Sequence, residues 1–309
     1  MQASDIKKVL IIGSGTMGRH IGLQNALYGC DVVFYDINEE ILQKALIHIG
    51  KIAAGLVRGG YITEEMAEAA KARISLTTNI AAAAVGVNLV SESVPENIEL
   101  KKKVWGEFSK YLPKDAILTT NTSTLLPSLF AESSGDPARF LAWHFAMPVF
   151  LLNIVDVMPH PGTDPAVTQI MMEHSRRVGQ TPIYIAKEWP KYVYNEMFVS
   201  LLAAAQRLAV NDVASVEDID RAWMVIMEMP RGPFGIMDNV GLDTCLAVTR
   251  EAVAADPNYP YGKEIIALFQ AKIDANERGR KTGKGFYTYP NPAYEQPGFV
   301  DRVYPKYKK

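Results

Sequence analysis

The sequence has few cysteines and no long apolar run. Its 309 residues include only Cys30 and Cys245, which do not make a disulfide framework, so the composition fits a reducing compartment. No segment approaches the roughly 20 apolar residues of a membrane-spanning helix. The apolar run at residues 9–12 is cut by glycine, which argues against a signal peptide. We therefore expect a cytoplasmic protein without a membrane partner.

The sequence also lacks an excess of charge of either sign. There are 32 Lys and Arg residues against 34 Asp and Glu, a formal net charge of −2, which argues against nucleic acid or an anionic membrane surface as partner. The five histidines and two cysteines do not have the spacing of metal ligands, so we expect no metal site. The length allows two domains and a substantial core.

A glycine-rich turn near the N-terminus is the most informative motif that is present. The apolar residues 9–12 lead into Gly13, Gly15 and Gly18, and an amphipathic run follows at 19–28. In a strand–turn–helix unit the first glycine allows the tight turn, and the second lets the backbone approach a pyrophosphate. The third lets the helix lie close to the strand. The motif predicts dinucleotide binding, with an ordinary tight turn as the alternative.

The residues around this motif indicate which dinucleotide is bound. Thr16 and Met17, between the second and third glycines, are expected to bind the cofactor, and the N-terminus of the expected helix offers N–H groups and positive potential to phosphates. Asp36 follows the second apolar run, at 32–35, where a carboxylate accepts hydrogen bonds from a ribose 2′-hydroxyl. The next residues would give a 2′-phosphate no positive charge, so we expect NAD(H) rather than NADP(H). They are Ile37, Asn38, Glu39 and Glu40.

The alternation of strand and helix patterns predicts an α/β fold, a Rossmann-type doubly wound sheet followed by an all-helical C-terminal domain. We expect a NAD-binding domain at 1–188, with a helical arm at about 39–73, and a helical substrate and dimerisation domain at 189–309. Further strands are expected at 74–77, 88–92, 116–120, 140–144, 154–158 and 183–186. Helices are expected at 97–111, 127–132, 165–179, 192–210, 216–228, 243–254 and 262–278, with a turn at 230–235.

Several polar residues follow expected strands, at the edge where open α/β sheets bind ligands. Asn121 and Ser123 come after the strand at 116–120, His144 ends the next strand, and Asp156 lies late in the one after. Asn195 lies near the start of the second domain. Taken singly each is weak evidence, because a histidine at a strand end is more often structural and a buried aspartate can simply cap a turn.

The whole chain resembles the 3-hydroxyacyl-CoA dehydrogenase family, especially the short bacterial 3-hydroxybutyryl-CoA dehydrogenases. The resemblance rests on ordered motifs from end to end. They are Gly13-Ser14-Gly15-Thr16-Met17-Gly18, Glu92-Ser93-Val94-Pro95-Glu96-Asn97, Asn121-Thr122-Ser123, His144-Phe145, Tyr192-Val193-Tyr194-Asn195, Gly232-Pro233-Phe234-Gly235 and Gly279-Arg280-Lys281-Thr282-Gly283-Lys284-Gly285-Phe286-Tyr287.

The resemblance implies roles for the polar residues. His144 matches the catalytic histidine, a general base that takes the proton of the substrate hydroxyl while hydride leaves for the nicotinamide. Asp156 matches the carboxylate that orients this histidine. Ser123 matches the serine that hydrogen-bonds the reacting oxygen, and Asn195 the asparagine that reaches the substrate. The expected cofactor-binding residues also include Glu96, near the nicotinamide ribose, together with Lys101 and Asn121.

The sequence departs from the family pattern on the substrate side. The usual partner of the histidine is glutamate, whereas Asp156 is one methylene shorter. The family often has asparagine where this chain has Met147, and its usual glycine and arginine around the helix motif are replaced by Lys191 and Glu196. None of these changes touches the dinucleotide motif.

The resemblance implies an acyl-CoA substrate, a short chain such as 3-hydroxybutyryl-CoA, a place in fatty acid metabolism and a homodimer. One alternative is a reductase of β-keto acids or diketo esters that does not need CoA, because residues 121–128 resemble that branch closely. Another is a non-catalytic NAD-binding protein like a lens crystallin relative. CoA carries phosphates, so a basic entrance is expected, for which the candidates are Lys51, Arg58, Lys101, Lys102, Lys103 and Lys191.

Overall fold

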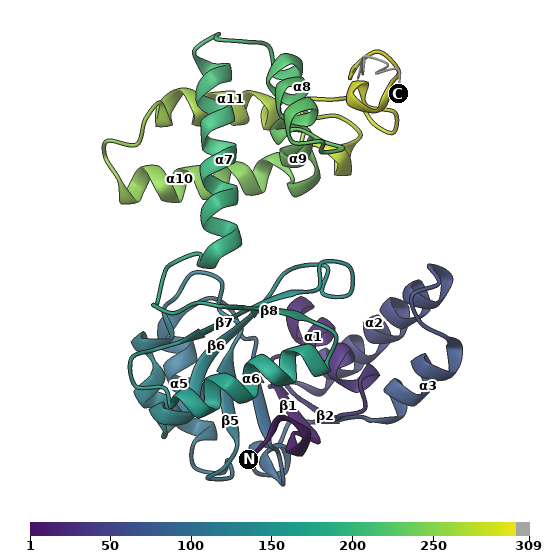
Figure 1. Ribbon diagram of the computed structural model, residues 1–309, viewed down its shortest axis with the longest axis vertical. Coiled ribbons are helices and arrows are strands. Elements are labelled where there is room, and N and C mark those ends of the chain that lie inside the picture. Colours follow the sequence, from purple (N-terminus) through teal and green to yellow (C-terminus); the bar gives the residue numbers. More distant parts are fainter. Residues whose placement is uncertain (301–309) are drawn as a thin grey trace, which may run out of the picture. The chain divides into compact units, whose positions relative to one another are not determined.

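The computed structural model describes residues 1–300, which fall into two compact units. The first runs from Met1 to Tyr194 and the second begins at Asn195. Figure 1 shows a sheet with helices in the first unit and helices alone as the main elements of the second. No helix among the described residues is long and apolar enough to span a bilayer.

The first unit is built on an eight-stranded sheet in the order β3-β2-β1-β4-β5-β6-β7-β8. All neighbouring strands are parallel except β6 and β7, which are antiparallel. The predicted α/β fold with a mostly parallel sheet is therefore confirmed. The strands are β1 (Lys8–Ile12), β2 (Asp31–Tyr35), β3 (Ile74–Thr77), β4 (Leu89–Glu92), β5 (Ile117–Thr120), β6 (Phe140–Phe145), β7 (Ile154–Pro159) and β8 (Thr181–Tyr184).

The central strand β1 shows why its sequence is a continuous apolar run. Successive side chains of a strand point to opposite faces of the sheet. Val9 and Ile11 enter one core, whereas Leu10 and Ile12 enter another. Since helices cover both faces, both sets are buried and the strand has no polar side to show.

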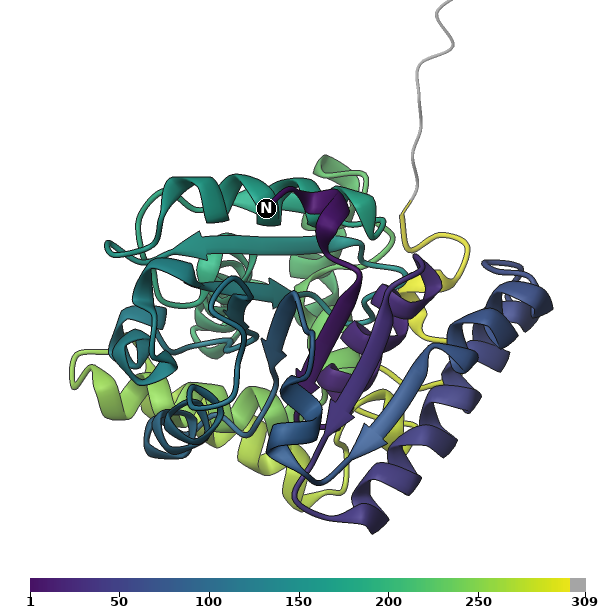
Figure 2. The ribbon, with the colours of Figure 1, turned by 90° about the horizontal axis from the view of Figure 1, so that it is seen from below.

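Helices on the two faces complete these cores. The helices α1 (Thr16–Leu27) and α6 (Pro165–Arg177) contribute to the core that contains Val9, and α4 (Ile80–Ala84) and α5 (Ile98–Phe108) to the other. Figure 2, in which the sheet is seen from below, shows helices on both of its sides.

The predicted helical arm is a pair of helices, α2 (Glu39–Arg58) and α3 (Glu64–Ala72). They lie side by side beyond the β3 edge of the sheet (Figure 2). Thr63 caps α3, because its hydroxyl accepts a hydrogen bond from Met66 N at 3.3 Å.

The antiparallel turn from β6 to β7 determines the geometry of the site. Only residues 146–153 connect the two strands, which is too short for a parallel crossover. The register places His144 directly opposite Asp156. The local connection, rather than a distant element, therefore brings these two side chains together.

The second unit packs helices around one apolar core that includes Phe234, Met237 and Phe269. Its helices are α7 (Tyr192–Val210), which starts in the first unit, α8 (Val216–Ile226), α9 (Pro233–Val240), α10 (Leu242–Ala255) and α11 (Gly262–Asp274). One expectation for this unit fails in detail. The predicted turn at 230–235 overlaps the start of α9, where Pro233 occupies the first turn, a position proline tolerates.

The predicted helix at 127–132 is wrong in type. The segment forms two short 3₁₀ helices, Pro127–Leu129 and Ala131–Ser134, joined at Phe130. The φ of Phe130, −142°, lies outside the helical range and breaks the helical run.

The last strand lies earlier than the predicted 183–186. It includes Pro182, which an edge strand tolerates because one side of its backbone needs no partner.

A buried histidine predicts how the stability of the first unit depends on pH. His174 is fully buried and its Nε2 lies 3.0 Å from Asn25 Oδ1. Burial, helped by the charge of Arg177, lowers the pKa of His174 to about 3. The unfolded chain, with an ordinary pKa of about 6.5, takes up the proton first as pH falls. We expect the free energy of unfolding to fall below pH ~6.5, by up to about 1.4 kcal/mol per pH unit.

Urea denaturation at several pH values tests this expectation, with His174→Gln as the comparison. Glutamine does not titrate but keeps a donor for Asn25. The variant should show a flatter decline in the free energy of unfolding below pH ~6.5 than the parent does. An equal slope in the two proteins would assign the acid sensitivity to other groups.

Candidate active site

The glycine turn after β1 leaves room where a phosphate group would lie. Gly13 has φ +96°, and a Cβ there would lie 2.9 Å from the carbonyl oxygen of Ser93. A Cβ on Gly18 would lie 2.0 Å from the carbonyl oxygen of Gly13, so the contact between α1 and this turn requires glycine. A Cβ on Gly15 would meet no atom within 4 Å. The open space therefore lies at Gly15, where α1 begins.

Asp36 is tied to the same turn. Its Oδ2 accepts hydrogen bonds from Ser14 N at 2.8 Å and Ser14 Oγ at 2.7 Å, and its Oδ1 accepts one from Ile37 N. The carboxylate therefore lies at the end of β2 beside the glycine turn. Oδ1, which accepts a single hydrogen bond, keeps a lone pair for a ribose hydroxyl. The nearest following cation, Lys44, is paired with Glu40 at 2.6 Å.

His144 and Asp156 form a buried hydrogen-bonded pair. His144 Nδ1 lies 3.0 Å from Asp156 Oδ2, and the two side chains are 10% and 6% exposed. The directly opposed register lets the shorter aspartate reach the ring, so the lost methylene does not break the contact. Because Nδ1 serves Asp156, Nε2 is the nitrogen left for proton exchange with another group.

Asn121 joins the end of β5 to the end of β6. Its backbone N–H donates to the Glu92 carbonyl oxygen at 2.8 Å, and its side-chain oxygen accepts from Phe145 N at 3.0 Å. The side chain is buried. Asn121 therefore fixes the strand end next to His144.

Glu96 organises the loop that carries Ser123. Its Oε1 accepts hydrogen bonds from the hydroxyl of Thr122, from Ser123 N at 2.9 Å, and from Thr124 N at 2.8 Å. Burial by itself raises the pKa of Glu96, but the bonds from Thr122 and Thr124 and the charge of Lys101 lower it below its ordinary value. The carboxylate is therefore ionised at neutral pH, and it holds a loop whose Ser123 side chain is exposed.

Lys101 lies beneath this loop and not at the surface. Its ammonium group is buried, at 2.7 Å from Glu92 Oε1 and 3.5 Å from Glu96 Oε2. Glu92 also accepts a hydrogen bond from Thr120 Oγ1 at 2.7 Å. As a member of a basic entrance for CoA, Lys101 is therefore excluded by its burial. Lys51, Arg58, Lys103 and Lys191 are exposed.

The sequence reasoning missed one aromatic contact in this site. Tyr192 stacks on the His144 ring, with centroids 4.4 Å apart and planes 13° from parallel. Its hydroxyl donates a hydrogen bond to the Thr122 carbonyl oxygen at 2.7 Å. In the motif Tyr192-Val193-Tyr194-Asn195 the family resemblance implies a role for Asn195 only, and the aromatic residue at its start is the signal in the sequence that could have indicated this contact.

Asn195, the remaining predicted site residue, is the first residue of the second compact unit. It is partly buried in the first turn of α7. Its role toward the substrate stays a prediction. Within residues 1–300 no group of His, Cys, Asp and Glu side chains is arranged to hold a metal ion.

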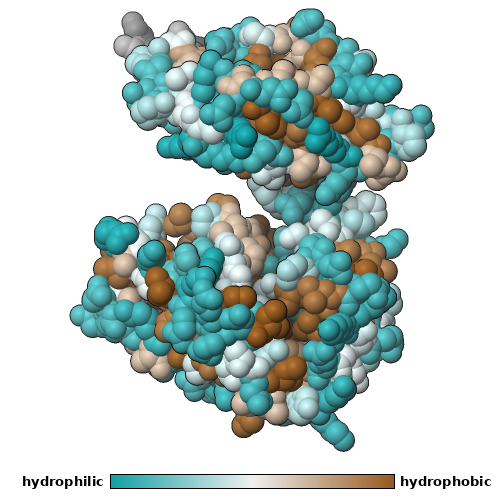
Figure 3. Space-filling model, turned by 180° about the vertical axis from the view of Figure 1, so that it is seen from behind, coloured by the Kyte–Doolittle hydropathy of each residue, from teal (hydrophilic) through white to brown (hydrophobic). Residues whose placement is uncertain are grey.

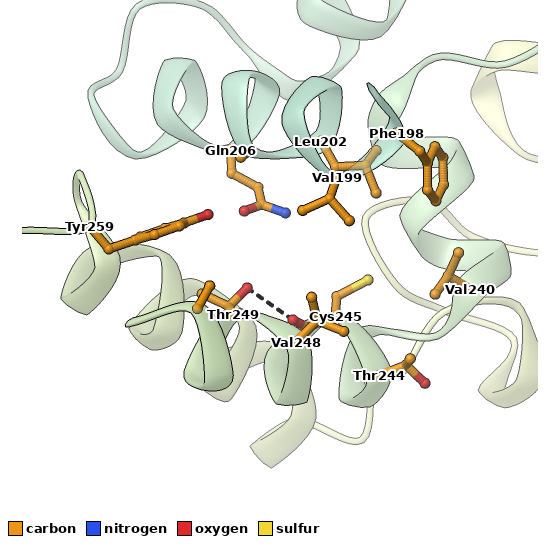
Figure 4. A pocket seen from close by; sticks show the side chains of 12 residues that line it. Phe198, Val199, Leu202, Gln206, Val240, Thr244, Cys245, Val248, Thr249 and Tyr259 are labelled. Atoms are coloured by element: carbon orange, nitrogen blue, oxygen red, sulfur yellow. Dashed lines mark hydrogen bonds between the residues drawn. The ribbon is translucent and has the colours of Figure 1, made fainter. Parts of the chain in front are cut away.

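An apolar pocket in the second unit is lined by no His, Lys, Arg, Asp or Glu side chain. It lies between α7 and α10 and has a volume of about 90 Å³. Figure 4 shows the hydrogen bond that the Thr249 hydroxyl donates to the Cys245 carbonyl oxygen on α10. Gln206 lies across the pocket, on α7. Burial raises the pKa of the Cys245 thiol to about 12, so the thiol stays protonated and unreactive at neutral pH. With its thiol protonated and no histidine or carboxylate in its lining, this pocket lacks the usual groups of an acid–base site.

Apolar side chains are exposed near the site as well as on other surfaces. Figure 3 shows them gathered in patches among hydrophilic residues on one face of the molecule. Among the exposed apolar residues are Met147, Leu151 and Leu152 in the segment after β6, which are 40%, 51% and 51% exposed. This segment begins two residues after His144. Its exposed apolar side chains therefore form an apolar rim that lies close to His144 along the sequence.

Comparison with known proteins identifies the family. The protein-family model described as "3-hydroxyacyl-CoA dehydrogenase, NAD binding domain" matches residues 8–189. The family model for the C-terminal domain of the same enzymes matches residues 192–289. A probable 3-hydroxybutyryl-CoA dehydrogenase of Deinococcus radiodurans is 32% identical over 282 residues, covering 90% of this chain and 99% of that relative.

Solved structures give the same picture. A diketoreductase matches with a TM-score of 0.86 and 35% identity, covering 92% of this chain and 99% of that one. The (S)-3-hydroxybutyryl-CoA dehydrogenase PaaH1 from Ralstonia eutropha matches with a TM-score of 0.81 and 29% identity over the same shares of the two chains. Together with the glycine turn and the His–Asp pair, these matches establish that the chain is an enzyme of the 3-hydroxyacyl-CoA dehydrogenase family.

Proposed function

We propose that the enzyme interconverts short-chain (S)-3-hydroxyacyl-CoA and 3-ketoacyl-CoA with NAD(H), and that His144 is its acid–base group. The observation that carries the proposal is the buried pair of His144 and Asp156 at the sheet edge that also holds the glycine turn. A histidine with one nitrogen fixed by a carboxylate presents the other for proton transfer.

The residues divide the reaction between them. In the oxidation direction His144 Nε2 takes the hydroxyl proton of the substrate while the C3 hydride leaves, and Asp156 stabilises the imidazolium that forms. Ser123 donates a hydrogen bond to the reacting oxygen, and Asn195 completes the substrate side. In reduction His144 returns the same proton to the forming alkoxide.

The chain's own geometry fits a bound dinucleotide. A Cβ on Gly15 would meet no atom within 4 Å, and this open space would receive the pyrophosphate, to which the N–H groups of Thr16 and Met17 at the start of α1 would donate. Asp36 would accept from the ribose. Bound NAD would supply the hydride acceptor. We further propose that Glu96 and Asn121 border the nicotinamide end, with Lys101 acting by holding Glu96.

Exchange of Asp36 tests the preference for NAD. In Asp36→Asn the side-chain oxygen still accepts from Ser14, but the charge that repels a 2′-phosphate is gone. We expect the ratio of kcat/KM for NAD over NADP to fall about 10- to 100-fold, the value of a hydrogen bond to a charged group. Steady-state kinetics with both cofactors measure it, and an unchanged ratio would contradict the role.

A second candidate function has one observation in its favour. Met147 replaces the asparagine that the family often carries, and with Leu151 and Leu152 it leaves an apolar rim beside the catalytic strand. This rim suits an uncharged dicarbonyl ester, and a diketoreductase is among the similar structures. The exposed Lys51, Arg58, Lys103 and Lys191 favour the phosphates of CoA instead.

Parallel assays of NADH oxidation with acetoacetyl-CoA and with ethyl acetoacetate distinguish the two functions. We expect the thioester to have the higher kcat/KM by at least about 100-fold, or some 2.7 kcal/mol of transition-state binding. An equal or higher kcat/KM with the ester would instead support the CoA-independent reductase function. The expected homodimer remains a prediction, supported by exposed apolar residues such as Met197 and Val248 on α7 and α10.

A further inference from the structure

Tyr192 contacts two parts of the active site with one side chain. Its ring lies parallel to the His144 ring at 4.4 Å, and its hydroxyl donates to the Thr122 carbonyl oxygen at 2.7 Å. Thr122 immediately precedes Ser123. The tyrosine therefore links the acid–base group to the loop that carries the expected partner of the reacting oxygen.

The tyrosine is held firmly in this place. Only 1% of its surface is exposed, and it packs with Ala142, Met158 and Ile185. Lys191 and Tyr192 itself have φ values of +65° and +60°. Two successive non-glycine residues in the left-handed region are unfavourable unless their surroundings fix them. The backbone is therefore bent locally in a way that delivers this ring to His144.

We propose that Tyr192 is a positioning residue that fixes the plane of His144 and the distance between His144 and the Ser123 loop. The proposal rests on the function proposed above. Asp156 holds the imidazole through a single atom, Nδ1, and one hydrogen bond leaves the ring free to turn about it. A stacked ring removes this freedom, so that Nε2 keeps one direction.

The hydroxyl of Tyr192 has a separate task. Burial and the nearby carboxylates of Glu96 and Asp156 raise the pKa of Tyr192 well above its ordinary value, so the hydroxyl remains a donor at neutral pH. Its bond to the carbonyl of Thr122 stops the tyrosine ring from sliding against the loop. A residue that only filled the core would not need the hydroxyl, because phenylalanine has nearly the same volume.

Two variants separate the ring from the hydroxyl. Tyr192→Phe keeps the stacked ring and loses the hydrogen bond, for which we expect kcat to fall about 2- to 10-fold. Tyr192→Ala loses both, for which we expect a fall of about 10- to 100-fold, as for a misplaced catalytic group. The Kd for NADH should stay within about twofold in both. Tyr184→Ala, at a tyrosine 54% exposed at the end of β8, is the matched control.

Carbethoxylation of His144 by diethyl pyrocarbonate gives a readout that does not depend on turnover. Peptide mapping reports its rate against exposed His48 in the same molecule. We expect the His144 to His48 ratio to rise several-fold in Tyr192→Ala, because one ring face is uncovered, and to be unchanged in Tyr192→Phe and Tyr184→Ala. If Tyr192→Ala does not fold, Tyr192→Leu takes its place, because leucine also removes the stacked ring and the hydroxyl, and kcat and the labelling ratio should change in the same direction.

The outcomes separate the two proposals. A parent enzyme inactive on both the thioester and the ester would overturn the proposed function, while the labelling still reports whether Tyr192 covers His144. With an active parent, a folded Tyr192→Ala or Tyr192→Leu that keeps kcat within about twofold and labels His144 at the parental rate would overturn the positioning role.

Discussion

Replacing His144 by glutamine should lower kcat by about 10²- to 10⁴-fold and leave NADH binding near the parental value, because general acid–base catalysis by a positioned side chain contributes about this much. Glutamine keeps an amide donor for Asp156, so the buried carboxylate is not left unpaired. Steady-state turnover and a fluorescence titration with NADH measure the two quantities.

His160→Gln is the matched control for this prediction. Measured over the whole residue, His160 and His144 are both 8% exposed. His160 Nε2, however, lies 2.9 Å from the carbonyl oxygen of Pro137, outside the site. Its variant should keep kcat within about twofold. If His144→Gln lost NADH binding or its thermal transition along with its turnover, His144 would be a structural residue and the mechanism would fail.

The second large effect is expected in the glycine turn. One glycine-to-alanine substitution there should weaken NADH binding without loss of stability, and another should destabilise the protein. Gly15→Ala places its Cβ in open space at an ordinary φ of −63°, so the thermal midpoint should not change. The same methyl group occupies the space for a pyrophosphate, and NADH affinity should fall at least tenfold, or about 1.4 kcal/mol. Gly18→Ala places its Cβ 2.0 Å from the Gly13 carbonyl oxygen and should destabilise the protein by about 1–3 kcal/mol.

Gly50→Ala controls for the methyl group itself. Gly50 lies within α2 and a Cβ there also meets no atom within 4 Å, but it is far along the chain from the turn. We expect its variant to bind NADH normally and to gain up to about 1 kcal/mol of stability from helix propensity. Parental NADH affinity in Gly15→Ala would mean that the open space at this turn is not a cofactor site.

The parts of the fold that depend on local pattern could be predicted from the sequence. The apolar run at residues 9–12 with its glycines and the helix at 192–210 depend on patterns that act over a few residues, and each appears as expected. The 3₁₀ segment at 127–134 and helix α9 differ because prolines and short lengths make helix, turn and 3₁₀ patterns alike.

The site was predictable only in part, for a related reason. Residues at strand ends can be listed from the sequence, and the short link at 146–153 could have indicated that β6 and β7 are antiparallel and that His144 faces Asp156. Tyr192 stacks on His144, and Glu96 accepts hydrogen bonds from the Ser123 loop. Both contacts join residues 26 or more positions apart in the sequence. No local pattern encodes such contacts, because they arise from packing after the sheet has formed.

Transfer of a labelled hydride tests the central claim most directly. The enzyme is incubated with NAD and (S)-3-hydroxybutyryl-CoA that carries deuterium on C3, and the NADH is analysed by mass spectrometry. The account predicts that NADH gains one deuterium per turnover in the parent and that His144→Gln does so at a rate lower by about 10²- to 10⁴-fold. Unlabelled NADH, no NADH, or an equal rate in the variant would contradict it.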